Sequence, residues 1–243
     1  MLRICTAGYF LRTCSAYVQQ LLCLEEDVRN KAIDLRGLTA GSLRVGTFSS
    51  AAIHLLPQIL SRFQERYPGV EVSVLNGDYA DVETALLSNT IDTGFVTLPS
   101  RDEFTIFPLF SDRLLAVVDA ENPVGKATAL ELQDLKDQTF IVPAEGSNYD
   151  IGKLFAQADV YPQKWLNIND DYAAIVMVRR KLGVTILPEL LVRELPMRGL
   201  RAIPLHGSER QIGLAAHHSR FLSPAVRAFI ECTRAVLEQA ESP

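Results

Sequence analysis

The sequence predicts an α/β fold of two lobes around a hinged cleft, preceded by one long helix. Three observations predict it. Apolar residues near the N-terminus recur at heptad spacing, and two successive series of alternating strand and helix patterns follow them. With 243 residues, the chain is long enough to bury two modest cores.

The N-terminal helix is predicted over residues 9–38, where apolar positions are separated by steps of four and three that alternate except for two successive steps of four near the end. These positions are Phe10, Cys14, Tyr17, Leu21, Leu24, Val28, Ala32 and Leu35. Charged residues occupy the other faces, so we expect this stripe to form a dimer interface with a second copy. The alternative is that the stripe docks on the globular part of its own chain. Gly37 and Gly41 then end the helix and provide a short hinge.

A first α/β series follows the hinge. Its expected elements, in order, are strand Leu43–Gly46, helix Ala51–Tyr67, strand Val70–Leu75, helix Asp81–Ser88 and strand Thr93–Val96. Parallel neighbours need crossover connections, and the favoured crossover is a helix. This order therefore predicts a parallel sheet with helices on both faces.

A second series begins after two further strands. Its expected elements are strands Phe104–Phe110 and Leu114–Val118, helix Leu130–Leu135, strand Phe140–Pro143, helix Asn148–Ala158, strand Trp165–Ile168, helix Tyr172–Leu182 and strand Val184–Leu187. The order of elements repeats that of the first series, which predicts a second α/β lobe.

The chain is expected to return to the first lobe near its end. Pro204 separates two apolar strands, Leu200–Ile203 and Ile212–Ala216, and the amphipathic helix Pro224–Leu237 follows them. We therefore assign residues 43–117 and 210–240 to the first lobe and residues 118–209 to the second. Two crossings between lobes create a hinged cleft, which is a preferred position for a ligand site.

The composition is that of an ordinary soluble globular protein. Hydrophobic residues make up 48% and charged residues 22%, which argues against a disordered or fibrous chain. The net charge of −5 leaves no overall basic field of the kind that a self-sufficient nucleic-acid binder carries. Arg12 interrupts the short apolar N-terminal stretch, and no segment reaches the roughly 18 apolar residues of a membrane span. We expect a cytoplasmic protein with no membrane partner.

The four cysteines do not form a metal or disulfide pattern. They are Cys5, Cys14, Cys23 and Cys232. No Cys-x-x-Cys pair occurs, and the nine-residue spacing of the first three suits neither a zinc site nor a secreted disulfide framework. We interpret them as reduced, small apolar residues, with a redox switch as the open alternative.

The segment Leu24–Val74 contains a predicted helix, then Gly-Ser-Leu-Arg-Val-Gly, then Leu-Leu-Pro on a helix, then Phe-x-x-x-Tyr-Pro-x-Val. This combination closely resembles the linker helix and the start of the effector-binding domain in LysR-type transcriptional regulators. Downstream features of the same family, such as Leu182-Gly183-Val184 leading to Leu187-Pro188-Glu189, recur in order. The resemblance implies two Rossmann-like lobes arranged as in periplasmic binding proteins, and the effector-sensing and dimerising region of a bacterial regulator.

The resemblance also bears on the N-terminus. Cys5-Thr6-Ala7-Gly8 is similar to the Leu-Thr-x-x-Gly sequence that leads into the family's linker helix. We therefore expect residues 1–8 to be the last edge of a winged helix-turn-helix, a domain of roughly sixty residues whose reading helix is missing here. On this interpretation DNA binding belongs only to a full-length form.

The first candidate ligand loop contains Thr47, Ser49 and Ser50. Hydroxyl groups and free backbone N–H groups at a helix start together suit a carboxylate, sulfate or phosphate. The resemblance points to the same turn, because LysR-type sensors commonly hold an anionic effector there. The alternative is that Ser49 or Ser50 only caps the helix. Thr97 directly follows a strand and is expected to face the same cleft.

The second lobe offers two further candidate turns. Ser147 and Asn148 precede a predicted helix, after Pro143 at the end of a strand, and form a second possible anion site. Asn169 follows a strand at the third turn, where Asp170 and Asp171 favour the helix dipole without any ligand. A helix cap is the alternative at each turn.

We expect no catalytic group, metal site or cofactor. No nucleophile elbow, phosphate loop or Gly-x-Gly-x-x-Gly motif occurs, and adjacent His217 and His218 on a strand would point to opposite faces. The expected function is that of a non-enzymatic sensor, a homodimer or homotetramer that binds a small anionic or polar metabolite. The alternatives are the solute-binding protein of a transporter, an enzyme with the same hinged fold, and a partner that forms non-DNA-binding heterodimers with a full-length relative.

Overall fold

The computed structural model describes residues 40–142, 145–162, 164–168, 170–218 and 222–241, together with Glu25 and Val28. Side chains are described in these ranges except at 145–149 and 240–241. The expected remnant 1–8 and the dimer-interface residues of the predicted helix 9–38 lie outside the described residues, apart from Val28. That residue is helical and 66% exposed.

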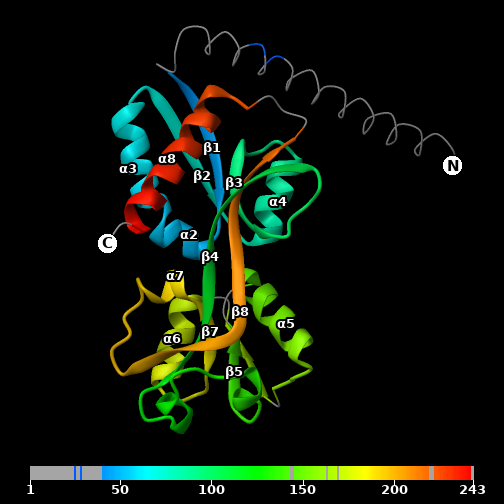
Figure 1. The fold of residues 1–243 in the computed structure, drawn as a ribbon, viewed down its shortest axis with the longest axis vertical. Helices are drawn as coiled ribbons and strands as arrows, with labels where there is room; N and C mark the ends of the chain where they lie inside the picture. The colour runs from blue at the N-terminus through cyan, green and yellow to red at the C-terminus, as the bar shows by residue number, and fades with distance from the viewer. Residues whose placement is uncertain are drawn as a thin grey trace, which may run out of the picture.

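The first lobe contains a parallel sheet, as predicted. Strand β1 (Gly41–Thr47) pairs in parallel with both β2 (Val70–Asn76) and β3 (Thr93–Leu98). One face packs against α2 (Ser49–His54), α3 (Leu56–Arg66) and α8 (Pro224–Glu241), and the other against α4 (Tyr79–Leu87). The apolar residues of these helices are therefore buried against the sheet. Figure 1 shows the position of these helices around the strands.

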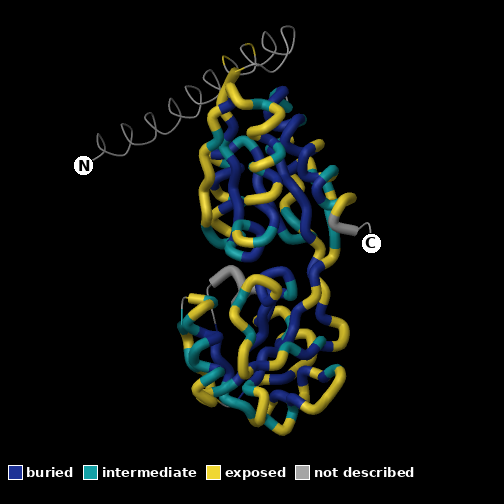
Figure 2. The backbone as a smooth tube through the Cα atoms, turned by 90° about the vertical axis from the view of Figure 1, so that its left-hand side faces the viewer, coloured by how far each residue is buried: buried dark blue, intermediate teal, exposed yellow. Residues whose placement is uncertain are grey.

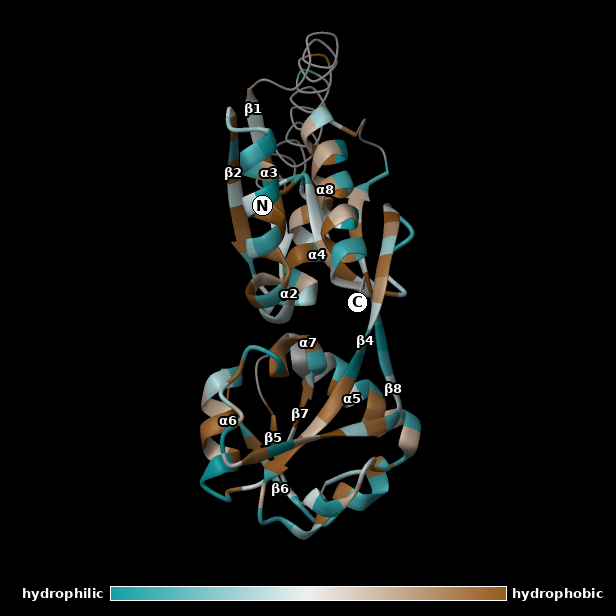
Figure 3. Cartoon of the chain, turned by 60° about the vertical axis from the view of Figure 1, so that its left-hand side comes forward, coloured by the Kyte–Doolittle hydropathy of each residue, from teal (hydrophilic) through white to brown (hydrophobic). Residues whose placement is uncertain are grey.

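Two long strands join the lobes. Strands β4 (Phe104–Asp119) and β8 (Leu200–His217) are antiparallel and run from one lobe into the other (Figure 1). The sequence predicted two separate strands in each of these stretches, and this prediction is wrong. The polar residues between the apolar halves continue the backbone pairing, because ladder hydrogen bonds do not depend on side-chain polarity. Figure 3 shows the hydrophilic stretch of both strands between the lobes.

The second lobe extends the same sheet. Strand β7 (Thr185–Pro188) pairs antiparallel with residues 114–117 of β4, on the N-terminal side of the expected boundary at 117/118. A bridge from Val184 to Phe140 connects this sheet to the parallel pair β5 (Thr139–Val142) and β6 (Lys164–Asn167). Helices α5 (Glu145–Ala158) and α6 (Asp171–Arg179) contribute to separate cores, and each lobe has its own buried interior (Figure 2).

Several helix boundaries differ from the predictions. The expected helix 51–67 is divided at Leu55 into α2 and α3, and Pro57, in the first turn of α3, has no N–H to donate to a continuous helix. The expected helix 130–135 is a bridge from Leu130 to Leu205 followed by a 3₁₀ turn, η2 (Leu132–Leu135), and a second 3₁₀ turn, η1 (Pro123–Lys126), precedes it. The short helix α7 (Glu189–Val192) has no counterpart among the predicted elements.

Two further observations complete the fold. The rings of His217 and His218 stack with centroids 5.5 Å apart, contrary to the prediction that they point to opposite faces, because β8 ends at His217. Among the described residues, no helix combines the length and the apolar character needed to cross a membrane.

Candidate ligand site between the lobes

Asp112 and Arg210 form an ion pair where the two long strands pass between the lobes. They are direct partners in the antiparallel register of β4 and β8, which places both side chains on one face of the ribbon. Arg210 Nη2 lies 2.6 Å and Nε 3.0 Å from Asp112 Oδ2. The backbone N–H of Leu190, in α7, donates to Asp112 Oδ1 at 3.1 Å. Strand register and the start of a second-lobe helix together hold this pair.

The first lobe supplies three more contacts to Arg210. Its Nη2 donates to Ser50 Oγ at 2.7 Å, and its Nη1 donates to the hydroxyl of Tyr79. The guanidinium also lies 5.4 Å from the centroid of the Phe48 ring, within the range of a cation–π interaction. Phe48 and Ser50 flank the start of α2, so the first lobe contacts the cation through that turn.

The local sequence positions Tyr79 at the start of α4. Asp78 caps this helix by accepting a hydrogen bond from the backbone N–H of Asp81 at 2.7 Å. The Asp81 carboxylate in turn accepts a hydrogen bond from the backbone N–H of Asp78. The Tyr79 ring packs edge-on against Phe48 with centroids 4.9 Å apart. The capping box and the aromatic contact therefore direct the Tyr79 hydroxyl toward Arg210.

Asp150 brings the second lobe into the same network. It lies on α5, and its Oδ2 accepts a hydrogen bond from the Tyr79 hydroxyl at 2.6 Å. The distance from Arg210 Nη1 to the same oxygen is 3.4 Å. One carboxylate of the second lobe is thus bound by a tyrosine of the first lobe and by an arginine of a crossing strand.

The network is almost completely shielded from solvent. Arg210, Asp112 and Asp150 are 6%, 5% and 8% exposed. Burial raises the pKa of Asp150 above its ordinary value of 3.8, although Arg210 opposes the shift. Burial disfavours the charged form of Arg210, but the oxygens of Tyr79, Asp112 and Asp150 raise its pKa overall, so it remains a cation. Burial likewise raises the pKa of Tyr79, which keeps the proton it donates to Asp150.

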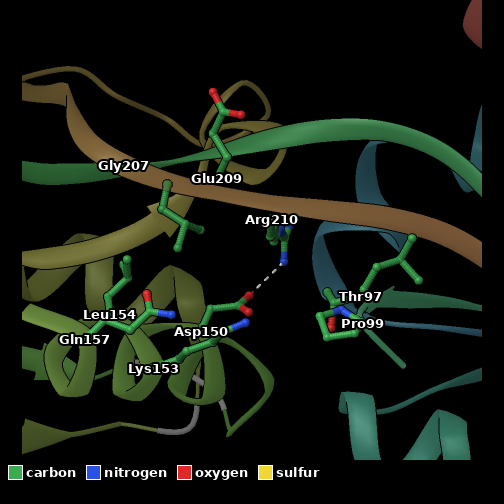
Figure 4. A pocket seen from close by; sticks show the side chains of 11 residues that line it. Thr97, Pro99, Asp150, Lys153, Leu154, Gln157, Gly207, Glu209 and Arg210 are labelled. Atoms are coloured by element: carbon green, nitrogen blue, oxygen red, sulfur yellow. Dashed lines mark hydrogen bonds and ion pairs between the residues drawn. The ribbon is translucent and has the colours of Figure 1, made fainter. Parts of the chain in front are cut away.

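A cavity of about 260 Å³ opens beside this network. The end of β3 and the following residues contribute Thr97 and Pro99, and α5 contributes Asp150, Lys153 and Gln157 (Figure 4). Arg210 lines it from β8. Pockets that bury drug-sized ligands measure roughly 300–1,000 Å³, and this cavity is slightly smaller, so its size suits only a small metabolite. Two cations, Lys153 and Arg210, and two carboxylates, Asp150 and Glu209, line it, so an anionic group would bind on the side of Lys153 and Arg210.

The structure brings some of the predicted site residues together. Thr97 lines the cavity, and Ser50 contacts Arg210. Ser49 is half-buried in the first turn of α2. Thr47 is fully buried, and its hydroxyl donates to the carbonyl of Phe48 at 3.4 Å. Thr47, Ser49 and Ser50 lie close together in sequence, but among them only Ser50 has a side-chain contact with Arg210 in the structure.

The candidate residues of the second lobe are placed less completely. Ser147 and Asn148 lie in the first turn of α5, which begins at Glu145 rather than at Asn148 as predicted, and their side chains are outside the described part. Pro143 and Asn169 also lie outside the described residues. Asp170 caps α6 by accepting from the N–H of Ala173 at 2.6 Å, which is the capping alternative foreseen at that turn.

Sequence reasoning did not find Tyr79, Asp112, Asp150 or Arg210. One signal was present in the sequence, because Asp112 and Arg210 lie in short polar stretches, Ser111–Arg113 and Ser208–Gln211, between the apolar halves of two strands, where the chain changes lobe. Opposite charges in two such breaks indicate a buried pair if the strands are neighbours. Among the described residues, no group of histidine, cysteine and carboxylate side chains is placed to hold a metal ion.

Comparison with known sequences identifies a family match over most of the chain. The family described as "LysR substrate binding domain" matches residues 36–238. A relative in Synechococcus elongatus, "Probable HTH-type transcriptional regulator LrrA", is 30% identical over 223 residues, which is 89% of this chain and 74% of the relative. GltC of Bacillus subtilis, a "Transcriptional dual regulator", is 29% identical over 200 residues, or 79% of this chain and 66% of that protein.

Solved structures share the fold at low sequence identity. The effector-binding domain of BenM with its effector benzoate has a TM-score of 0.74 at 20% identity, covering 83% of this chain and 94% of that one. The regulatory domain of Synechocystis CcmR in complex with 2-PG also has a TM-score of 0.74 at 20% identity, covering 82% and 98%. The two-lobe α/β fold expected from the sequence is therefore confirmed.

Proposed function

The chain belongs to the LysR substrate-binding domain family, and from this premise we propose that it senses a small anionic or polar metabolite in the cavity between its lobes. The observation that carries the proposal is the cavity of about 260 Å³ beside the buried cation of Arg210, with Thr97 and Lys153 in its lining. The structural neighbours named with benzoate and with 2-PG support an anionic ligand class.

The role is regulatory rather than enzymatic. The relatives LrrA and GltC are named as transcriptional regulators, which supports this function over that of a solute-binding protein of a transporter or an enzyme of the same fold. We place the protein in the cytoplasm, where a regulator can meet both its metabolite and DNA. DNA binding belongs to a form that carries a winged helix-turn-helix.

Signalling requires a ligand that prefers one arrangement of the lobes. The continuous strands β4 and β8 are the connection about which the lobes can move, and ligand groups held from both sides favour a closed state. A ligand that binds the open and closed states equally does not shift the equilibrium between them. Contacts that exist only in one state therefore determine the response.

The ligand proposal is tested by thermal shift and calorimetry with small carboxylates, amino acids, aromatic acids, sulfate and phosphate. Saturation at about a hundred times the dissociation constant stabilises the native state by roughly 2.7 kcal/mol. Lys153→Met should weaken binding of an anionic hit by about tenfold or more, because it removes a charge-assisted contact. Lys136→Met, an exposed lysine of the same lobe that does not line this cavity, is the matched control. No binding across the panel would refute the proposal.

We further propose that the heptad positions of residues 9–38 form the dimer interface. Leu21→Glu or Val28→Glu should convert the dimer to a monomer in light scattering, because each places a charge in an apolar seam. Arg29→Glu, on the charged face of the same predicted helix, should leave the dimer intact. A dimer that tolerates both seam substitutions would contradict this interface.

A further inference from the structure

The Asp150 carboxylate lies where the inter-lobe cavity meets Arg210. Both residues line the cavity, and an interaction joins them across it (Figure 4). We propose that Asp150 is a built-in stand-in for a ligand carboxylate, and that the carboxylate of an effector replaces it beside Arg210. The inference rests on the proposed function, since it takes this cavity to be the effector site.

The guanidinium offers one side to an exchangeable anion. Nε and Nη2 of Arg210 are engaged by Asp112 and Ser50 at 2.6–3.0 Å, behind the cavity. Nη1 donates to the Tyr79 hydroxyl and also approaches Asp150 Oδ2, at 3.4 Å. The Asp112 contacts are short and the Asp150 contact is long, so Asp150 is the carboxylate that can leave without breaking the pair set by strand register.

The charge count also makes Asp150 the dispensable partner. Asp112 balances the charge of Arg210 at 2.6 Å, whereas Asp150 meets Arg210 only at 3.4 Å and also has the opposite charge of Lys153 on its own helix. Desolvation raises its pKa, which means that burial disfavours its ionised form even beside the arginine. A ligand carboxylate would meet the same Nη1 and would lie beside Thr97 and Lys153, which line the cavity.

Replacement would change the connection between the lobes. Asp150 belongs to α5 of the second lobe, and Tyr79, which binds it at 2.6 Å, belongs to α4 of the first. When Asp150 leaves, this link is lost and α5 becomes free to take another position relative to α4. The ligand class is therefore a small carboxylic acid, and its binding is coupled to rearrangement of α5.

Chemical rescue tests the stand-in directly. Asp150→Ala deletes the carboxylate, and acetate is the probe that can occupy the vacated place. At equal pH and ionic strength, acetate should raise the Tm of Asp150→Ala over chloride by at least roughly twice the rise seen in the unmodified protein, because a new native-state site is created. Adding Arg210→Met to Asp150→Ala should abolish the acetate effect.

A matched control removes a carboxylate of a different kind. Asp134 in the second lobe accepts a hydrogen bond from the backbone N–H of Glu131 at 2.9 Å and is exposed. Asp134→Ala should lose stability without any acetate-specific recovery. Equal acetate effects in Asp134→Ala and Asp150→Ala would overturn the proposal.

Asp150→Asn provides a second measurement if Asp150→Ala does not fold. This variant keeps the side-chain shape but lacks the competing charge, so calorimetry should show acetate or benzoate binding at least about tenfold more tightly than to the unmodified protein. Unchanged affinity would overturn the proposal. If the unmodified protein binds a carboxylate from the panel but neither Asp150 variant responds to acetate, the stand-in alone fails. If the panel yields nothing while Arg210-dependent rescue occurs, Arg210 accepts a carboxylate in place of Asp150, but the sensor function fails and the replacement of Asp150 by an effector fails with it.

Discussion

Asp112 and Arg210 face each other directly across the β4–β8 ribbon, with Arg210 Nη2 2.6 Å from Asp112 Oδ2. The pair lies where both strands leave one lobe for the other, and it is almost fully buried. Helices of both lobes contact it, through Ser50 of α2 and the backbone of Leu190 in α7. This ion pair is therefore the buried centre of the passage between the lobes.

Removing the buried cation should be costly. Arg210→Met leaves Asp112 and Asp150 without their counter-charge, and breaking a buried pair in this way costs about 3–5 kcal/mol. Arg101→Met is the control, because the Arg101–Glu83 pair is 48% and 20% exposed and should contribute less than about 1 kcal/mol. Denaturant unfolding measures both. Similar losses in the two variants would contradict a buried pair at Arg210.

Stability should depend on pH through Asp150. Its pKa is raised in the folded protein, so the native state binds more protons than the unfolded state between the ordinary pKa of 3.8 and the raised value. The free energy of unfolding therefore falls as pH rises through this window, and the loss is complete above the raised pKa. Asp150→Asn should remove this component, so its stability relative to the unmodified protein should increase from low to neutral pH. A difference in unfolding free energy between the two proteins that does not change with pH would exclude a contribution from Asp150.

The Tyr79 hydroxyl should contribute through two partners at once. Tyr79→Phe keeps the ring contact with Phe48. It removes the hydroxyl that donates a hydrogen bond to Asp150 and accepts one from Arg210. Leaving buried polar groups without a partner costs about 1–3 kcal/mol. Tyr172→Phe, at a tyrosine that is 55% exposed, should change the unfolding free energy by less than about 0.5 kcal/mol. A neutral Tyr79→Phe would mean that its hydroxyl does not support the network.

A second contact between the lobes should be weak. His54 Nδ1 of α2 lies 2.7 Å from Oε1 of Glu194, which follows α7, and the Glu194 side chain is 45% exposed. With His54 protonated, Glu194→Gln should cost at most about 1 kcal/mol, and the cost should shrink in high salt because solvent and ions screen an exposed pair. Unfolding at low and high ionic strength measures it. A salt-independent loss of about 3 kcal/mol would show that this contact rivals Arg210.

Two glycines near the cavity should respond to alanine with opposite signs. Gly207, in the bulged part of β8 between the lobes, has a φ of +65°, so Gly207→Ala should cost about 1–2 kcal/mol in backbone strain. Gly152 lies in α5, and a methyl group added there would meet open space, so Gly152→Ala should stabilise by about 0.5–1 kcal/mol. Unfolding free energies of the two variants check both signs.

Local sequence patterns were sufficient to predict most of the helices and strands of the first lobe. Periodicity of two or of 3.6 residues records which faces are buried, and the order of strand and helix patterns then requires parallel pairing. Strands β1, β2 and β3 and helix α8 accordingly lie close to their predicted ranges. Ser50 and Thr97 were found for the same local reason, since each lies near the end of a strand that could be read from the sequence, although β3 continues through Thr97 to Leu98.

The centre of the candidate site depended on pairing between distant segments. Asp112 and Arg210 meet because β4 and β8 continue through both lobes in one register, and Tyr79 and Asp150 meet because α4 and α5 belong to opposite lobes. The sequence by itself determined the fold class, the family and the order of the elements, because periodic burial is encoded locally. Only the tertiary structure decided which polar side chains share one buried site, because strand register and the approach of the lobes are set by contacts between residues far apart in the chain.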